Sequence, residues 1–288
     1  MSSAAIETVE LSKHYRNRPV VSELTFRVAP GEVYAFVGPN GAGKTTVIRL
    51  VTGLAFPTSG TVRLLGEDPL ETPQVRHKLG AVVEAPAAFY PYLTGRGNLD
   101  LHARLAGGVA AGRISEVLDM MELGNASDRK VGVYSLGMRQ RLGVAAALLT
   151  EPEVLILDEP ASGMDPLSIH LVHRVLQEAA QRGAAVLLST HHLDEVTAYC
   201  SRVGILEQGR LIDEVDLRQR RERYRVRVSD AKEAYIALEL EPYIDTLVTR
   251  EDEVIFYLND PAALGSVSRR LFEADVSLFE LRKDTFNL

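Results

Sequence analysis

Residues 38–46 restrict the fold of this chain more than any other stretch. Their sequence, GPNGAGKTT, matches G-x-x-x-x-G-K-[ST] in full. An apolar run at 32–38 precedes the motif and a helix pattern at 45–54 follows it. A loop between a buried strand and a helix is the setting in which this motif binds phosphate. We therefore expect an α/β domain with a nucleotide site at this loop; a glycine-rich turn before a helix is the alternative.

Each residue type in the loop suits one part of a nucleotide. Gly41 and Gly43 let backbone N–H groups close around a β-phosphate, and Lys44 reaches the β- and γ-oxygens. The Thr45 hydroxyl is a candidate ligand of Mg²⁺. The residues of this loop expected to bind the nucleotide are Gly38, Pro39, Asn40, Gly41, Ala42, Gly43, Lys44, Thr45 and Thr46.

Apolar runs alternate with helix patterns along the first part of the chain. Such alternation is typical of a mainly parallel sheet. Between Thr94 and Thr150 only helix patterns occur, which indicates a helical insertion at about 94–150. Strands are expected at 22–29, 32–38, 80–84, 153–158, 184–189 and 202–207.

The end of the chain has an order of its own. Residues 224–288 show the pattern βαββαβ, which is ferredoxin-like and predicts a small α+β domain. The charged stretch 214–223 before it reads as a linker, with the basic run at 218–223 as its core. This run is expected to be a solvated face, with contact to anionic lipid as the alternative. The first domain is expected at 1–217.

Two carboxylates follow the strand expected at 153–158. Asp158 and Glu159 would lie at the carboxyl edge of a parallel sheet, where ligands bind. Asp158 is expected to hold Mg²⁺ through water, and Glu159 to orient and deprotonate an attacking water. His191 follows the next buried strand and is expected to donate to a γ-phosphate. A solvated acidic turn and a structural histidine are the alternatives.

A second anion site is expected at the segment 133–149, VYSLGMRQRLGVAAALL. Ser135 and Gly137 form a turn before a helix rich in Ala and Leu. The amino end of a helix attracts anions. The alternative is an ordinary helix capped by Ser135.

Five motifs occur in a fixed order: GPNGAGKTT, YSLGMRQR, LILDEP, SGMDP and STHH. In this order they resemble the nucleotide-binding subunit of ABC transporters, over about residues 6–220. The resemblance implies a P-loop NTPase of the ABC ATPase type with a helical subdomain, which binds ATP and Mg²⁺ and hydrolyses ATP. It also implies that two ATPase subunits hold two ATP molecules head to tail, and the intact motifs favour a homodimer. A separate transmembrane permease would bind them at the cytoplasmic face of the cell membrane.

Further residue roles come only from this resemblance. Ser135, Gly137 and Met138 would form the signature that acts in trans, on the γ-phosphate held by Lys44 of the other copy. Asp165, in SGMDP, matches the aspartate of the D-loop, which links the two composite sites.

One position matches the family and others depart from it. Tyr15 stands where the family places an aromatic residue that stacks on adenine; a surface tyrosine is the alternative. Leu136 and Met138 replace a glycine and a glutamine of the usual signature, while the phosphate-facing residues are kept. Glu84 stands in place of the Q-loop glutamine. Because a carboxylate only accepts hydrogen bonds, Glu84 is expected to face a metal ion or water.

The segment 82–95, VVEAPAAFYPYLTG, gives a finer resemblance. Together with SLGMRQRLG it resembles the ATPases of bacterial exporters for bacitracin, lantibiotics and related peptide antibiotics. The aromatic residues at 89–92 would form the groove that receives a coupling helix of the permease. Packing of the helical insertion against the core is the alternative.

Composition limits the other functions. The net charge is −7 and the pI about 5.6, which argues against broad nucleic-acid binding. The single Cys200 excludes an intrachain disulfide, no apolar run is long enough to span a bilayer, and no secretory signal is expected at the start. The absence of an Asn-Lys pair argues against a GTPase. A soluble ABC ATPase, or an ATP-gated switch with negligible turnover, is the alternative to a transport ATPase.

Overall fold

The computed structural model describes residues 4–16, 18–83, 89–191, 196, 199–217, 222–239, 241–258 and 261–283. The chain divides into two units, Met1–Arg218 and Gln219–Leu288. Glu84, for which the sequence predicts a metal- or water-facing role, lies outside the described residues. The two units are described separately below.

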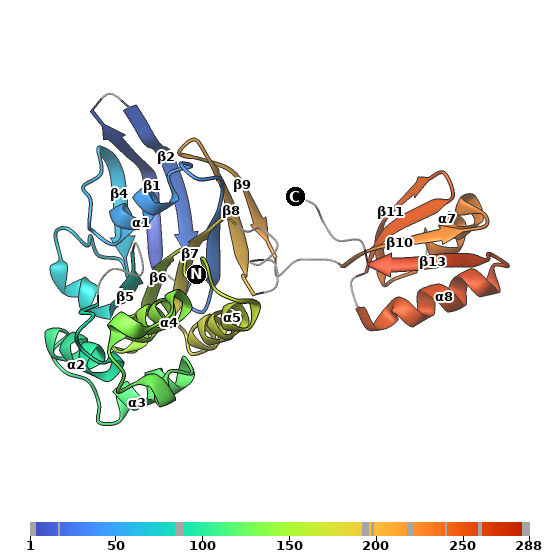
Figure 1. The fold of residues 1–288 in the computed structure, drawn as a ribbon. Coiled ribbons are helices and arrows are strands. Elements are labelled where there is room, and N and C mark those ends of the chain that lie inside the picture. Colours follow the sequence, from blue (N-terminus) through green and yellow to red (C-terminus); the bar gives the residue numbers. More distant parts are fainter. Residues whose placement is uncertain are drawn as a thin grey trace. The chain divides into compact units, whose positions relative to one another are not determined.

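A six-stranded sheet forms the centre of the first unit (Figure 1). Every neighbouring pair of strands is parallel except β8 with β9, so the mainly parallel sheet predicted from the sequence is confirmed. All residues of β3, β6 and β7 are buried, as expected for strands covered on both faces. The order is β5 (Leu79–Val82), β6 (Val154–Asp158), β7 (Ala185–Thr190), β3 (Val33–Val37), β8 (Arg202–Glu207) and β9 (Arg210–Asp216).

Strand β9 corrects one boundary of the sequence analysis. The stretch 214–223 reads as a linker, but residues 214–216 belong to β9, and the next strand begins at Glu222. The charged sequence misleads because β9 is an edge strand, and edge strands carry charges that discourage pairing with other chains. One of these charges has a structural partner: Glu214 accepts a hydrogen bond from the Tyr34 hydroxyl at 2.7 Å.

A second, three-stranded sheet in this unit is antiparallel. Its order is β2 (Arg18–Val28), β1 (Ile6–Tyr15) and β4 (Ser59–Leu64). Only β2 is expected from the sequence, because its last residues alternate strictly between buried and exposed. The buried side chains of this sheet join one core cluster with Phe36 of β3 and with α1 (Lys44–Val51).

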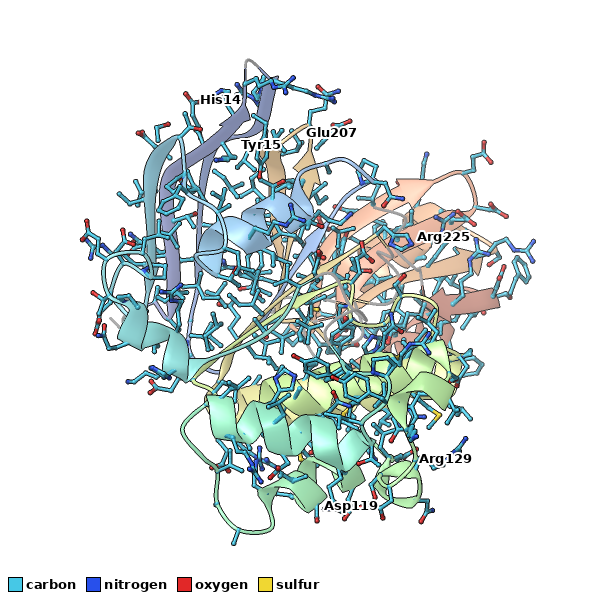
Figure 2. The ribbon with its side chains drawn as sticks, turned by 60° about the vertical axis from the view of Figure 1, so that its left-hand side comes forward. His14, Tyr15, Asp119, Arg129, Glu207 and Arg225 are labelled. Carbon is cyan, nitrogen blue, oxygen red and sulfur yellow. The ribbon has the colours of Figure 1, made fainter. Side chains whose placement is uncertain are left out.

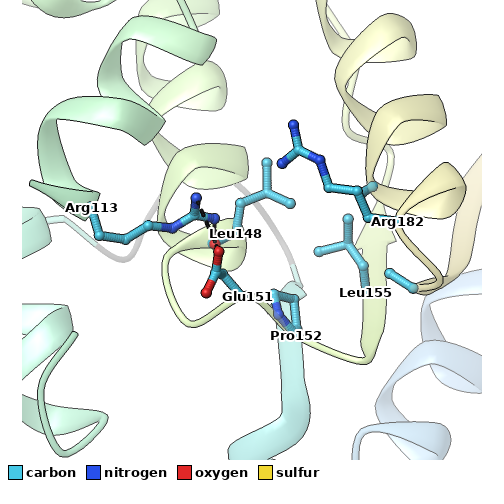
Figure 3. Close-up of a pocket in the computed structure, with 8 residues that line it drawn as sticks. Arg113, Leu148, Glu151, Pro152, Leu155 and Arg182 are labelled. Carbon is cyan, nitrogen blue, oxygen red and sulfur yellow. Dashed lines mark hydrogen bonds and ion pairs between the residues drawn. The ribbon is translucent and has the colours of Figure 1, made fainter. Parts of the chain in front are cut away.

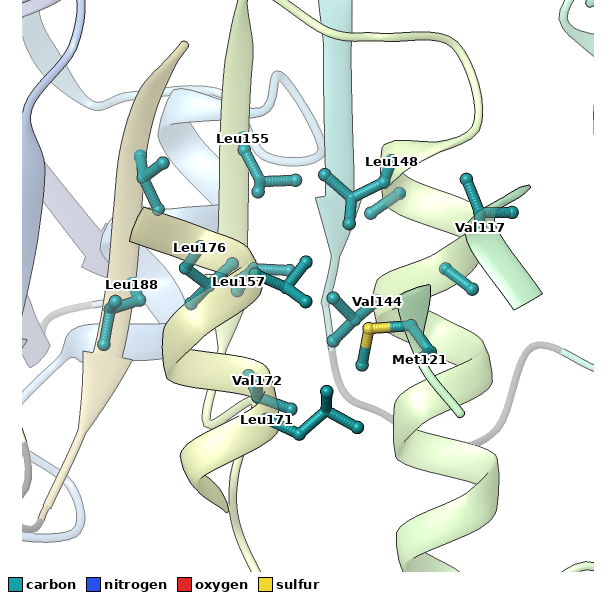
Figure 4. Close-up of a cluster of buried hydrophobic side chains, with 14 of the residues drawn as sticks. Val117, Met121, Val144, Leu148, Leu155, Leu157, Leu171, Val172, Leu176 and Leu188 are labelled. Atoms are coloured by element: carbon teal, nitrogen blue, oxygen red, sulfur yellow. The ribbon is translucent and has the colours of Figure 1, made fainter. Parts of the chain in front are cut away.

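Residues 94–150 contain helices and no strand longer than an isolated bridge, as the sequence predicts. Their buried side chains form the largest core cluster with α5 and one face of the central sheet (Figure 4). Helix α4 is buried on several sides, which explains why it is rich in Ala and Leu without a polar stripe. The helices of this region are α2 (Gly95–Leu105), α3 (Arg113–Met120) and α4 (Leu136–Leu148), with short 3₁₀ helices at Gly124–Ala126 and Val131–Val133. Outside it lie α5 (Pro166–Gln181) and a 3₁₀ helix at Pro73–Lys78.

The second unit has the element order βαββαβ that the sequence predicts. Its sheet has the order β11-β12-β10-β13, and all three pairs are antiparallel. Side chains of both helices, including Leu238 and Leu271, pack with Val226 and Phe256 in one core. The elements are β10 (Glu222–Val228), α7 (Ala231–Glu239), β11 (Ile244–Arg250), β12 (Glu253–Leu258), η4 (Pro261–Ala263), α8 (Leu264–Glu273) and β13 (Leu278–Lys283).

Candidate active site

The glycine-rich loop between β3 and α1 is shaped by its glycines. Gly43, the residue before α1, has φ of 103°, and a Cβ atom there would lie 2.7 Å from the Val20 carbonyl oxygen. A side chain is therefore excluded both by conformation and by space. Among the described residues no side chain caps α1, so the N–H groups of its first turn point into the loop without a capping acceptor. Such a helix start is suited to bind an anion.

Lys44 places its ammonium group inside this loop. Its Nζ donates to the carbonyl oxygens of Gly38 at 2.7 Å and Pro39 at 3.3 Å. It also lies 3.5 Å from Oε1 of Glu159. Because the side chain is only 6% exposed, its charge is held where it acts on the pocket rather than on solvent.

The two carboxylates predicted at the end of β6 have different surroundings. Asp158 is buried, and its Oδ1 accepts a hydrogen bond from the Ser189 hydroxyl at 2.5 Å. Glu159 has φ of 48°, a left-handed conformation that is uncommon for residues other than glycine. Its backbone N–H donates to Ser189, to the carbonyl oxygen at 3.2 Å and to Oγ at 3.1 Å. The end of β7 thus fixes the side chain of Asp158 and the backbone of Glu159.

His191 completes this group. It follows β7 directly, and its Nδ1 lies 2.8 Å from Oε2 of Glu159. Lys44, Glu159 and His191 are the residues predicted to be catalytic, and the structure brings all three together. The carboxylate lies between an ammonium and an imidazole, which fixes where its two oxygens are placed.

One pocket of about 370 Å³ contains most of the residues predicted to bind the nucleotide. It also contains Val20 and Ser162, neither of which is predicted to bind the nucleotide. Val20 lies in no motif, and Ser162 begins the motif SGMDP, in which only Asp165 is given a role. Gly38 and Pro39 contribute their carbonyl groups to Lys44 instead of lining the pocket. The pocket is lined by Val20, Asn40, Gly41, Ala42, Gly43, Lys44, Thr45, Thr46, Glu159, Ser162 and His191.

Tyr15 is not among the residues that line this pocket. It lies at the end of β1, next to His14 (Figure 2). Its ring is about half-exposed, and the Lys13 ammonium lies 5.0 Å from the ring centroid. Stacking of Tyr15 on adenine stays a prediction.

The signature residues lie outside the pocket that holds Lys44. Ser135 caps α4, and its hydroxyl oxygen accepts from the Met138 N–H at 3.1 Å. The cap predicted as the plain alternative is therefore present, and it leaves the signature role untested. Neither Ser135, Gly137 nor Met138 lines the pocket.

Asp165 has a clear structural contact. Its carboxylate caps α5 by accepting from the Ser168 N–H at 3.0 Å and the Ser168 hydroxyl at 2.7 Å. These hydrogen bonds lower the pKa of Asp165. The side chain therefore sets the start of α5, and a link between two composite sites stays a prediction.

The hydroxyl of Thr45 and the carboxylate of Asp158, the residue before Glu159, fit a magnesium ion that is bound together with a nucleotide. Thr45 lines the pocket, and Asp158 at its strand end has a second carboxylate oxygen besides the one that Ser189 bonds. Mg²⁺ is usually held by one or two protein oxygens, water and substrate phosphates. Among the described residues there is no group of three or more His, Cys, Asp or Glu side chains that would form an all-protein metal site.

The aromatic segment after Glu84 divides into two parts. Phe89 packs against the main core, with its ring 5.7 Å from the ring of His102. Tyr90 and Tyr92 are exposed, and their ring centroids are 5.5 Å apart. Phe89 therefore follows the packing alternative, whereas the two tyrosines present an aromatic surface.

A second pocket, of about 250 Å³, lies at the opposite end of β6 (Figure 3). Arg113 on its wall is 6% exposed and donates to the carbonyl oxygens of Leu148 at 2.6 Å and Leu149 at 3.3 Å. Its Nη1 lies 2.9 Å from the Glu116 carboxylate. These carbonyl groups lie at the carboxyl end of α4, so Arg113 caps that helix. We therefore assign this pocket a structural role.

Comparison with known proteins agrees with this geometry. The model of the family described as ABC transporter matches residues 21–162. The bacitracin transport ATP-binding protein BcrA of Bacillus licheniformis is 35% identical over 285 residues, which is 97% of this chain and 93% of BcrA. A solved ATP-binding subunit of an ABC transporter aligns with TM-score 0.68 and 33% identity, over 74% of this chain and 90% of that one.

A dimeric bacterial ABC transporter cassette aligns with TM-score 0.67 and 24% identity, over 74% of this chain and 98% of the cassette; this likeness shows the fold alone. In the part of the chain that the structure describes, no helix has the length and apolar character needed to cross a membrane.

Proposed function

The chain belongs to the ABC transporter family of ATP-binding, ATP-hydrolysing subunits, and on this premise we propose that it powers a membrane exporter. The observation that carries the ATPase part of the proposal is the meeting of Lys44, Glu159 and His191 at one pocket, beside the uncapped start of α1. The resemblance predicted from the five motifs is confirmed at the level of the family.

The proposed chemistry is attack of water on the γ-phosphate. The N–H groups at the start of α1 and the Lys44 ammonium bind the phosphates and neutralise their charge. The Glu159 carboxylate orients the attacking water and takes its proton, while His191 donates to the γ-phosphate. Mg²⁺, when bound with the nucleotide, supplies further charge neutralisation, and Thr45 and Asp158 are the residues that would hold it.

We propose that two copies of the chain form the working unit. Ser135 and Gly137 lie at the start of α4 but do not line the pocket of Lys44, so the same subunit does not use both anion sites on one nucleotide. A second subunit would bring its own Ser135 to the γ-phosphate. Because both motif sets are intact, a homodimer with two equivalent sites is the simplest arrangement.

The transport role rests on the relatives and on one surface. BcrA is named as a bacitracin transport protein. We propose export of an antibiotic or a related amphipathic compound through a separate permease chain, with the subunit at the cytoplasmic face of the membrane. Tyr90 and Tyr92 would meet the permease, since exposed aromatic pairs are typical of binding surfaces.

The direct test replaces the base. Glu159→Gln keeps the size of the side chain and removes its ability to take a proton, so we expect ATP binding to persist and kcat to fall by about 10²–10⁴-fold. Glu151→Gln is the matched control: Glu151 has nearly the same backbone, φ 51° against 48°, and lies before β6 instead of after it. Unchanged turnover in Glu159→Gln would remove Glu159 from the mechanism.

The exporter role is tested separately. The tagged chain, purified from detergent-solubilised membranes of its own host, should bring down an integral membrane protein. Recovery of ribosomes or DNA instead would favour a soluble ABC ATPase. Double substitution of Tyr90 and Tyr92 by Ser should lower the yield of the membrane protein without changing ATP turnover of the chain alone.

A further inference from the structure

Two segments that are separate motifs in the sequence touch each other within one subunit. These are the start of α4 and the loop 162–164, which precedes α5. Gly163 has φ of 71°, and a Cβ atom built on it would lie 2.8 Å from Cδ2 of Leu136. The Leu136 side chain therefore lies directly on the backbone of the loop. A Cβ atom on Gly137 would be in ordinary contact with Met164, at 3.9 Å.

A hydrogen bond joins the same two segments one turn further along α4. Nε2 of Gln140 donates to the carbonyl oxygen of Ser162. The Gln140 side chain is only 5% exposed, and its Oε1 has no hydrogen-bond partner within the described residues. The bond to Ser162 is thus what offsets the burial of this amide, and it fixes the distance between helix and loop.

Ser162 leads from this contact to the nucleotide pocket. It lines the pocket, and its own N–H donates to the carbonyl oxygen of Glu159 at 3.2 Å. The backbone of Ser162 is therefore bonded on one side to the proposed base and on the other to Gln140. A shift of α4 relative to the pocket has to break or bend one of these two bonds.

We propose that Leu136 and Gln140 are positioning residues, which fasten the start of α4 to the loop 162–164 so that a subunit's signature and its own pocket shift together. The inference rests on the proposed pairing of two subunits, because only then does Ser135 face a nucleotide. A subunit whose pocket is filled presents its signature to the partner in one fixed position. Leu136 replaces the usual glycine of the signature, and a glycine would have no side chain to make this contact.

If this is so, the cooperativity of ATP hydrolysis between two subunits depends on the contact of Leu136 and Gln140 with the loop 162–164. The affinity of a single subunit for ATP does not depend on it. The experiment uses the full chain with Mg²⁺ and ATP. The variants are Leu136→Ala and Gln140→Met, with Leu136→Met as the conservative replacement. Leu105→Ala is the matched control, because Leu105 is an exposed leucine at the end of α2 outside the contact. The measurements are kcat, the Hill coefficient for ATP, the Kd for ATP of the unpaired subunit, and Tm.

We expect Leu136→Ala and Gln140→Met to lower kcat about tenfold and to bring the Hill coefficient to about 1, with the Kd of the unpaired subunit within about twofold. Leu136→Met should restore both values, and Leu105→Ala should match the parent chain. Unchanged kcat and Hill coefficient in both variants would overturn the proposal. So would a parallel loss of ATP affinity, kcat and Tm, which would mark a general packing role.

The two proposals fail in different ways. If Glu159→Gln abolishes turnover while Leu136→Ala retains full cooperativity, the active site stands and the positioning role is wrong. If the parent chain shows no turnover that depends on Glu159, the proposed function is wrong, and the positioning role falls with it.

Discussion

Arg113 offers the sharpest test of the forces that hold the first unit together. The predicted change is Arg113→Met, which keeps an apolar stem and removes the guanidinium. The lost contacts are the two hydrogen bonds to the carbonyl oxygens of Leu148 and Leu149, and the ion pairs with Glu116 and Glu151. A hydrogen bond to a charged group contributes about 1.5–3 kcal/mol, and the bond at 3.3 Å belongs at the low end.

The ion pairs add little to this sum, because the Glu116 and Glu151 side chains are 53% and 74% exposed and solvent screens them. We therefore expect Arg113→Met to lower the free energy of unfolding by about 3 kcal/mol. For a unit of this size, each kcal/mol lowers Tm by about 2–4 °C, so the expected loss is roughly 6–12 °C.

The measurement is urea unfolding followed by circular dichroism at 222 nm, because the chain contains no Trp to serve as a fluorescent probe. Arg174→Met is the control: Arg174 lies on the exposed side of α5, and its nearest carboxylate oxygen is 3.9 Å away, on Glu178. This variant should stay within about 0.5 kcal/mol of the parent. If the urea midpoint of Arg113→Met equalled that of Arg174→Met, the hydrogen bonds of Arg113 to the carboxyl end of α4 would not contribute to stability.

Three further predictions follow from single contacts. Gly43→Ala should abolish ATP binding in equilibrium dialysis, because a methyl group at φ 103° would lie 2.7 Å from the Val20 carbonyl oxygen; retained binding would contradict the loop geometry. Ser135→Ala should cost about 1 kcal/mol in urea unfolding, through loss of the cap on α4, and should lower ATP turnover while the Kd of the unpaired subunit is kept. Burial, with help from His170, lowers the pKa of His173 to about 4, below its ordinary value of 6.5. Because the unfolded chain binds this proton more readily, stability should fall as the pH drops from 6.5 toward 4, by about 1–3 kcal/mol. His173→Phe keeps the stack on Tyr199, at 3.7 Å between ring centroids, and should flatten this part of the pH profile. An unchanged slope would assign the pH dependence to other groups.

The parts of the site that the sequence predicts are those in which neighbours in sequence are also neighbours in space. The residues of the loop 38–46 are contiguous in sequence, and so are Asp158 and Glu159 at the end of β6. The strands that lead to them, β3 and β6, are marked by unbroken apolar runs. The two missed members of the pocket, Val20 and Ser162, are ordinary residues that tertiary packing brings to the site. Ser189 begins the motif STHH but has no predicted role, although it bonds both Asp158 and Glu159, because the sequence does not show which strand lies beside β6.

Fold prediction fails where strands are irregular. In β1 the alternation of buried and exposed residues is broken at Glu10, whose φ is 50°, and the pairing register with β2 shifts there. In β4 only Val62 and Leu64 are buried, which is too short a pattern to read. The cap formed by Arg113 could not be predicted from the sequence either, because its carbonyl partners lie 35 and 36 residues further along the chain.

The two ends of strand β6 lie beside two different sites, one that stabilises the fold and one that is proposed to hydrolyse ATP. Its amino end follows Glu151 and Pro152, near Arg113, which caps α4, and Glu159, directly after its carboxyl end, lines the nucleotide pocket. Five residues of strand span about 17 Å, which keeps the groups at its two ends out of direct contact. Substitutions at the two ends should therefore have independent effects: Arg113→Met should lower the unfolding midpoint with kcat preserved below that midpoint, and Glu159→Gln should lower kcat with the midpoint preserved. If Arg113→Met also lost activity in the folded state, the strand would be transmitting strain between its ends, and the independence of the two sites would be wrong.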